Sequence, residues 1–165
     1  MTTRALIAAI ASGATFATVG VLTHVEPLAI ARLAVLGAAL GSAAFFDLAQ
    51  RRIPNRIVLP AAATCAALTL AASLPLSLLA GLATILVLLI VSLRWPAALG
   101  MGDVKLALLL VLGLDGDALR ALALGLILAA LAGVALVIRH GGTAWRTSLP
   151  MAPFLAVGAL LTVVA

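Results

Sequence analysis

The sequence predicts an all-α bundle of six to seven transmembrane helices with a cytoplasmic N-terminus. Hydrophobic residues make up 65% of the chain and charged residues 9%, against roughly 45–50% and about 25% in a typical soluble domain. Several uncharged stretches approach the roughly 20 residues that cross a bilayer. Basic residues fall in alternate connections, as the positive-inside rule expects. We therefore expect residues 1–165 to form one integral-membrane domain, in which residues 1–27 add a span and an outer loop to a core over 28–165.

This composition excludes a soluble globule, a disordered tail and a coiled coil. The chain has 165 residues, enough for at most about eight spans, so no large soluble domain fits beside the helices. The net charge of +5 comes from dispersed residues and forms no basic groove, so we expect no nucleic-acid partner.

The first two expected spans are residues 5–23, which follow Arg4, and residues 28–46, which are apolar except for Arg32. A signal peptide is an alternative for the first span, because Arg4 could be its basic region. No convincing small-residue cleavage site follows that span, so we predict a helix that is retained.

The next two spans come from one long apolar run. Residues 57–93 are uncharged for 37 positions, too many for a single crossing. Pro75 lies near the middle of this run and has no N–H to donate within a helix. We therefore divide it into spans near 57–73 and 76–93. The many Ala and Gly residues favour close packing of such helices in lipid.

Three shorter segments complete the bundle. Residues 100–114 form a short apolar segment apart from two charges, and residues 118–138 form another, with Arg120 near its beginning. The last segment is marginal: residues 147–165 are uncharged, but two prolines, the second of them Pro153, limit the usable helix to about 154–165.

The distribution of charged residues predicts how the bundle is oriented in the membrane. With the N-terminus inside, eight of the ten basic residues lie on the cytoplasmic side, namely Arg4, Arg51, Arg52, Arg56, Arg94, Lys105, Arg139 and Arg146. Glu26, Asp115 and Asp117 lie in outer loops, where the two aspartates are expected to be an ordinary acidic loop. Arg32 is expected to pair with Glu26 or to extend toward the headgroups.

The sequence offers no evident metal or cofactor site. Cys65 is the single cysteine and lies within an apolar run, which excludes an intramolecular disulfide and a Cys-x-x-Cys zinc site. His24 and His140 have no ligand spacing. We therefore expect no cofactor and no metal.

Two acidic residues lie on the basic side of the predicted bundle. Asp47 ends the second span and Asp103 begins the fifth, 56 residues later, so both are expected at the inner edge of the hydrocarbon layer. Two carboxyl groups a few ångströms apart cannot both ionise cheaply and titrate as a unit. One can then act as a base toward water and the other as an acid toward a carbonyl, the logic of aspartic proteases. We expect the pair within reach of one bridging water.

The neighbouring residues suit such a site. Gly100 and Gly102 permit close approach of another chain, and Pro54 ends the helical trend after the first aspartate. Asn55 is expected to cap the third span. Lys105 follows the second aspartate by two residues, so the two do not share a helix face.

Other interpretations remain open at this point. Either aspartate alone could be a capping or interface residue, and the Arg51, Arg52 and Arg56 group could contact lipid headgroups. A small proton- or ion-coupled transporter could use the two aspartates as ion sites, although transporters often show internal repeats and midplane charges. A non-catalytic membrane scaffold is a third possibility.

Three segments resemble one enzyme family. Residues 47–56 look like the first aspartate motif of type IV prepilin peptidases, and residues 100–106 look like their second, Gly-x-Gly-Asp. Residues 150–159 are similar to a Pro-Phe-Gly-Pro-Phe segment near that family's C-terminus, with Met151-Ala152 in place of Phe-Gly. The three occur in the family's order.

This resemblance implies a plasma-membrane aspartic endopeptidase whose active site faces the cytoplasm and which removes the leader from prepilin or pseudopilin substrates, typically after a Gly. It implies Asp47 and Asp103 as the catalytic pair. The supporting or substrate-binding positions would be Pro54, Asn55, Gly100, Gly102 and Lys105. Long members carry a Cys-x-x-Cys insertion and also methylate the product, so this chain is similar to the short form, which is a peptidase without methyltransferase activity.

Overall fold

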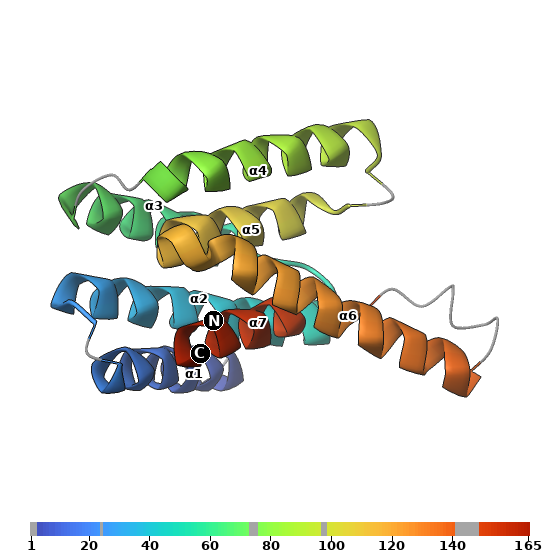
Figure 1. Ribbon diagram of the computed structural model, residues 1–165. Coiled ribbons are helices and arrows are strands. Elements are labelled where there is room, and N and C mark those ends of the chain that lie inside the picture. Colours follow the sequence, from blue (N-terminus) through green and yellow to red (C-terminus); the bar gives the residue numbers. More distant parts are fainter. Residues whose placement is uncertain (1–2, 24, 73–75, 97–98, 141–148) are drawn as a thin grey trace.

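A computed structural model of the chain describes residues 3–23, 25–72, 76–96, 99–140 and 149–165. Those residues form helices and connections without any strand, which confirms the predicted all-α class (Figure 1). The elements are α1 (Thr3–Leu22), α2 (Pro27–Gln50), α3 (Asn55–Ala72), α4 (Leu76–Arg94), α5 (Met101–Leu114), the 3-10 turn η1 (Asp115–Asp117), α6 (Ala118–His140) and α7 (Ala152–Val164).

Each of the seven expected segments corresponds to one helix. The predicted break at Pro75 lies outside the described residues, between the end of α3 and the beginning of α4. The last helix begins at Ala152 rather than at residue 154. It can include Pro153 because the first N–H groups of a helix have no intrahelical acceptor, so a proline there costs no hydrogen bond.

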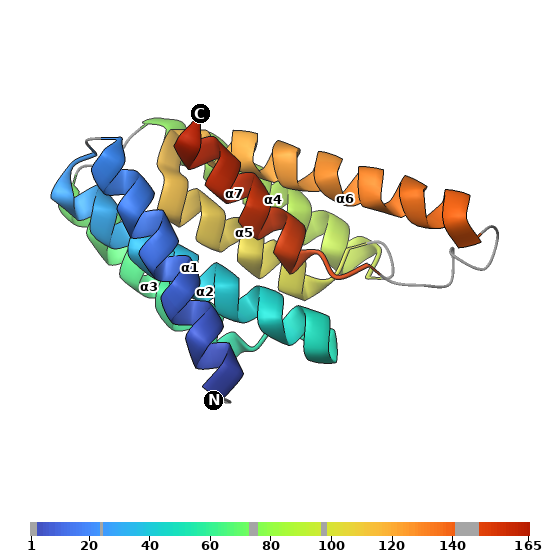
Figure 2. The same cartoon turned by 90° about the horizontal axis from the view of Figure 1, so that it is seen from below.

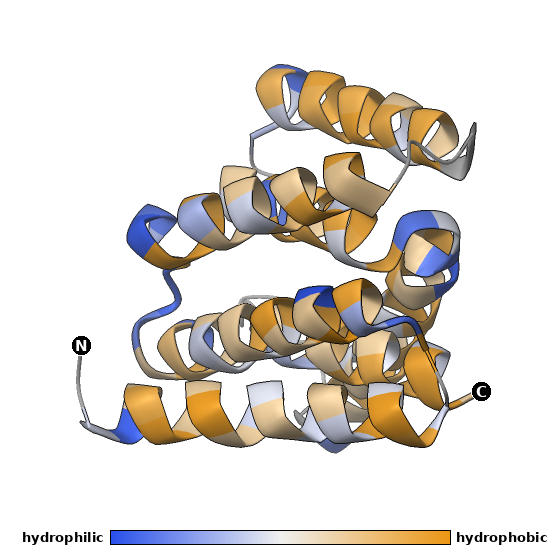
Figure 3. Ribbon diagram, turned by 90° about the vertical axis from the view of Figure 1, so that its left-hand side faces the viewer, coloured by the Kyte–Doolittle hydropathy of each residue, from blue (hydrophilic) through white to orange (hydrophobic). Residues whose placement is uncertain are grey.

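The described helices are apolar enough for a multi-pass membrane protein. Four stretches have the length and composition to cross a membrane, and these are Thr3–Leu22, Pro27–Gln50, Asn55–Ala72 and Met101–Arg139, the last holding both α5 and α6. The segments Leu78–Arg94 and Ala152–Val164 are shorter apolar helices. Apolar residues dominate the helices (Figure 3), and large side chains such as Ile138 are exposed, as lipid-facing residues are.

The core lies along α2 and α5. Leu36 and Leu40 of α2 pack with Leu106, Leu109 and Leu110 of α5, and all five are fully buried. Helix α2 contacts α1, α3, α5 and α7, whereas α5 contacts α3, α4, α6 and α7 as well as α2. The two helices that carry the predicted aspartates are therefore the most enclosed part of the bundle.

Small residues allow neighbouring helices to approach closely, as the composition predicts. A Cβ atom on Gly41 of α2 would lie 2.7 Å from the Ala8 carbonyl oxygen of α1. A Cβ atom on Gly158 of α7 would lie 2.5 Å from the backbone nitrogen of Gly125 in α6. Because both contacts are with backbone, even alanine would force these helices apart.

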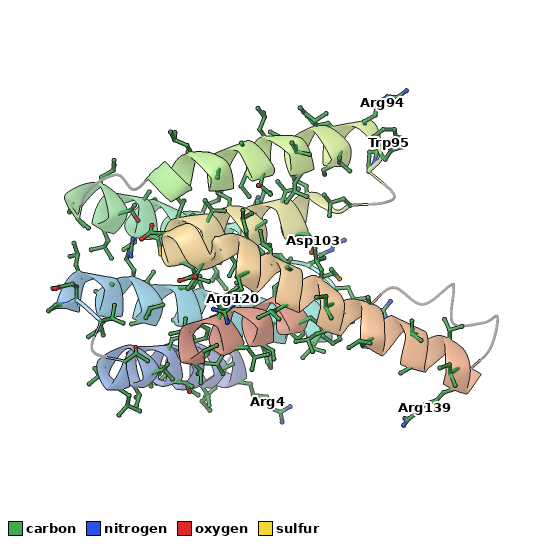
Figure 4. All side chains as sticks on the ribbon, viewed as in Figure 1. Arg4, Arg94, Trp95, Asp103, Arg120 and Arg139 are labelled. Carbon is green, nitrogen blue, oxygen red and sulfur yellow. The ribbon has the colours of Figure 1, made fainter. Side chains whose placement is uncertain are left out.

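The helix ends that carry the predicted aspartates lie at one end of the bundle. The end of α2 and the beginnings of α3, α5 and α7 lie at the same end of the bundle (Figures 1 and 2). Arg94 and Arg139 lie toward this end too (Figure 4). The basic residues that the sequence assigns to one side are thus grouped with both predicted aspartates, except Arg146, which lies outside the described residues.

The expectation for Arg32 is wrong. Its guanidinium forms an ion pair with Asp115 rather than with Glu26, and it does not extend to the surface, since its side chain is 11% exposed. Asp115 is therefore more than part of an acidic loop. The sequence places Arg32 in the second span and Asp115 in an outer loop, and only the packing of α2 against the end of α5 makes them partners.

Candidate active site

A cavity of about 410 Å³ lies at the end of the bundle where α2, α5 and α7 meet. Three segments that are distant in sequence form its wall: the end of α2 with the following connection, the beginning of α5, and the residues before α7. The described lining residues are Asp47, Arg51, Arg52, Ile53, Gly100, Gly102, Asp103, Lys105, Leu149, Pro150 and Met151. Both predicted aspartates face one cavity, and all three motifs contribute to it.

Asp47 lies where the end of α2 meets the beginning of α7. It lies in the last turn of α2, where Arg51 adopts a left-handed conformation with φ of 51° and donates its N–H to the Asp47 carbonyl. The Asp47 side chain is 8% exposed, and its Oδ2 accepts the backbone N–H of Ala152 at 2.9 Å. Ala152 is the first residue of α7, where N–H groups need an external acceptor. Asp47 therefore caps α7.

Asp103 lies in the first turn of α5 and is half-buried. Its N–H donates to the Gly100 carbonyl oxygen at 3.0 Å, and Figure 4 places the residue at the beginning of the helix. The positive end of the helix dipole favours a carboxylate in this turn. The Asp103 carboxyl is also close enough to Asp47 for the two to interact electrostatically. The cavity thus brings two acidic groups to one site.

The two glycines beside Asp103 leave room for neighbouring atoms. A Cβ atom on Gly102 would lie 3.0 Å from Ile53 Cδ1, so this glycine lets the connection after α2 approach α5. A Cβ atom on Gly100 would lie 3.4 Å from Asp103 Oδ2. Side chains at these positions would press on the cavity wall.

Asn55 and Lys105 join α3 to α5. The expectation that Asn55 caps the third span is wrong, since Pro54 precedes the helix and its carbonyl accepts the N–H of Val58. The Asn55 side chain instead accepts a hydrogen bond from Lys105 Nζ at 2.8 Å. Gly100, Gly102 and Lys105 are among the described lining residues, whereas Pro54 and Asn55 are not.

Sequence reasoning missed the residues immediately before α7. Leu149, Pro150 and Met151 line the cavity, and Ala152 supplies the hydrogen bond to Asp47. The third motif was the available signal, because it begins at Pro150, but its chemical role depends on a backbone N–H that any residue except proline could supply.

The wall combines basic and apolar residues. Arg51, Arg52 and Lys105 make one part of it electropositive, and Ile53, Leu149 and Met151 make another part apolar.

Among the residues that the structure describes, no three His, Cys, Asp or Glu side chains are grouped as a metal ion would require. Two carboxyl groups beside a polar opening can act on a water molecule and a carbonyl group.

The comparison with protein families gives one match. A model of the type IV leader peptidase family matches residues 34–138, which is more than half of the 165-residue chain. The matched region includes both aspartates and excludes α1 and α7. No curated protein and no solved structure matches the chain.

Proposed function

Because this chain belongs to the type IV leader peptidase family, we propose that it removes the leader of type IV prepilin-like proteins at the cytoplasmic face of the membrane. Asp47 and Asp103 are its catalytic pair. The observation that carries the proposal is that both residues line one cavity at the basic end of the bundle. The peptidase unit spans residues 1–165 as a single domain.

The pair acts on water and peptide together. One ionised carboxylate takes a proton from water as the water oxygen attacks the scissile carbonyl carbon, and the protonated carboxyl gives its proton to the carbonyl oxygen. The tetrahedral intermediate then breaks its C–N bond as the leaving nitrogen takes up the proton that came from water, and one of its hydroxyl groups returns a proton to the second carboxylate. The products are a carboxylic acid and an amine, and the reaction requires no cofactor.

The contact with α7 occupies one oxygen of Asp47. Because Oδ2 of Asp47 accepts the Ala152 N–H, that oxygen does not carry the shared proton. Either carboxyl can supply the acid that starts the cycle, because each lies beside a helix N-terminus, where a charged carboxylate is favoured.

The test is leader cleavage by the purified protein in lipid vesicles. A prepilin from the same cell should lose its leader, and mass spectrometry should place the cut after the Gly that ends the leader. Adding S-adenosylmethionine should leave the new N-terminus unmethylated, and a chelator should not slow cleavage. An intact prepilin after incubation with well-folded protein would refute the proposal, and chelator inhibition reversed by zinc would point to a metalloprotease.

Labelling of single cysteines should show the proposed orientation in intact cells. In a background without native cysteine, residues 48–56, 95–99 and 140–149 should react only when the cytoplasm is accessible. Residues 24–27 and 115–117 should react from outside, because the basic connections stay on the cytoplasmic side. The reverse pattern would place the cavity on the wrong side of the membrane for the proposed substrates.

A further inference from the structure

A charged cluster lies at the other end of the two helices that carry the aspartates. Arg32 of α2 forms an ion pair with Asp115, which directly follows α5, and their side chains are 11% and 20% exposed. Arg32 Nη1 also donates to Thr69 Oγ1 of α3 at 3.0 Å. The Thr69 hydroxyl in turn lies 3.0 Å from the carbonyl oxygen of Leu112 in α5. This Arg32–Asp115 cluster joins α2, α3 and α5.

The spacing along each helix relates this cluster to the cavity. Asp47 follows Arg32 by 15 residues, which is about 22 Å along a helix, and Asp115 follows Asp103 by 12 residues, which is about 18 Å. Helices α2 and α5 run in opposite directions. A contact between Arg32 and Asp115 therefore places the two aspartates at depths that differ by about 4 Å, less than one helical turn.

Stability alone is a poor explanation for this ion pair. Removing two charges from water costs several kcal/mol per ion, and replacing a buried pair by apolar residues is often neutral or stabilising. Here one side-chain atom of each partner, Arg32 Nε and Asp115 Oδ1, is buried without a hydrogen-bond partner. The best-attested use of such buried polar groups is to fix the register of packed helices.

Apolar contacts between α2 and α5 specify register weakly. The buried residues that meet there are mostly leucines, and one leucine can replace another if a helix slides by a turn. Sliding would separate Arg32 from Asp115 and leave two unpaired charges in a low-dielectric surrounding. The cluster thus makes every register of α5 against α2 except the observed one unfavourable.

We propose that Arg32 and Asp115 are positioning residues, whose ion pair fixes the register of α5 against α2 and thereby holds Asp103 beside Asp47. The effect on catalysis rests on the proposed function, whereas the effect on register does not. Neither residue touches the cavity that holds the two aspartates, so their influence on the reaction is indirect.

A disulfide reporter can measure register without any activity. A Cβ atom on Gly102 would lie 3.4 Å from Ile53 Cβ, close to the 3.5–4.5 Å of a disulfide. The reporter carries Ile53→Cys and Gly102→Cys with Cys65→Ala, and the rate of disulfide formation in membranes under a mild oxidant is measured. Leader cleavage is measured separately in chains without these reporter cysteines.

The decisive variant combines Arg32→Met with Asp115→Asn, because it removes both charges and leaves neither one buried alone. We expect this variant to accumulate in the membrane but to form the reporter disulfide at least about tenfold more slowly. Its kcat should fall by between about 10-fold and 100-fold, since small misplacements of reacting groups have effects of that size. KM should change little, because the cavity wall is intact.

Two further variants separate register from folding. Arg32→Lys keeps the charge and should restore most of the cross-linking rate and of kcat, even if the double variant accumulates poorly. Asp117→Asn changes an exposed acidic residue of the same turn and should leave both quantities at the parental level.

The outcomes are distinct. Parental cross-linking in the double variant would overturn the register role, and slow cross-linking with parental kcat would overturn the positioning role. Slow cross-linking in the double variant, together with a parental chain that cleaves no prepilin, would support the register role and refute the proposed function instead.

Discussion

Asp47→Asn and Asp103→Asn should each abolish leader cleavage while the protein still inserts and accumulates in the membrane. Asparagine keeps the size of aspartate but can neither accept the proton of an attacking water nor exchange one with its partner. General acid–base groups contribute about 10²–10⁴-fold to rate, so each variant should lose activity by at least that factor. The measurement is the rate of leader removal in vesicles, with membrane content determined by immunoblot.

The double variant gives a stricter test. Residues that act as one unit are not additive, so Asp47→Asn combined with Asp103→Asn should be no slower than either single variant. Asp117→Asn is the matched control, because its side chain is exposed and lies beyond the other end of α5. Residual cleavage at the parental rate in either single variant, with its amount verified, would remove that residue from the mechanism.

Ala152→Pro should reduce kcat by about 10-fold to 100-fold. Proline has no N–H, so the hydrogen bond to Asp47 Oδ2 is lost, and hydrogen bonds to charged groups contribute about 1.5–3 kcal/mol. Proline suits the first turn of a helix, and Pro153 already occupies the next position. The change removes the donor, but a proline also disfavours the αR conformation of the preceding Met151, so thermal stability must be measured beside kcat.

Ala152→Gly is the matched control, because glycine keeps the N–H and removes one methyl group. This variant should retain kcat within a few-fold of the parent. The comparison uses prepilin cleavage at saturating substrate, with thermal stability measured for both variants. Equal kcat values for the proline and glycine variants would show that α7 does not hold Asp47 for the reaction.

Much of the fold follows directly from the sequence. Each apolar segment became a helix because a bilayer leaves backbone groups no partner except one another. The alternation of basic connections also predicted which helix ends lie together. In the structure, Asp47 and Asp103 lie at one end of the bundle, as this prediction requires. The end of the bundle at which a residue lies is therefore predictable from hydropathy and charge along a single chain.

The rotation of each helix about its axis is not predictable in the same way. In lipid all faces of a helix are apolar, so a hydrophobic pattern does not say which face meets which neighbour. Close contacts such as Gly158 against Gly125 decide this instead, and they depend on shape. The partner of Arg32 was mistaken at the sequence level for this reason.

By itself, the sequence determined the helices, which of their ends lie together and the identity of the two acidic residues at the basic end. Only the tertiary structure decided that α7 donates a backbone N–H to Asp47, that Lys105 binds Asn55 and that Arg32 meets Asp115. Each of these contacts joins residues at least 50 positions apart. Local composition controls where a segment lies in the bilayer, whereas specific polar contacts form only after the helices have packed against one another.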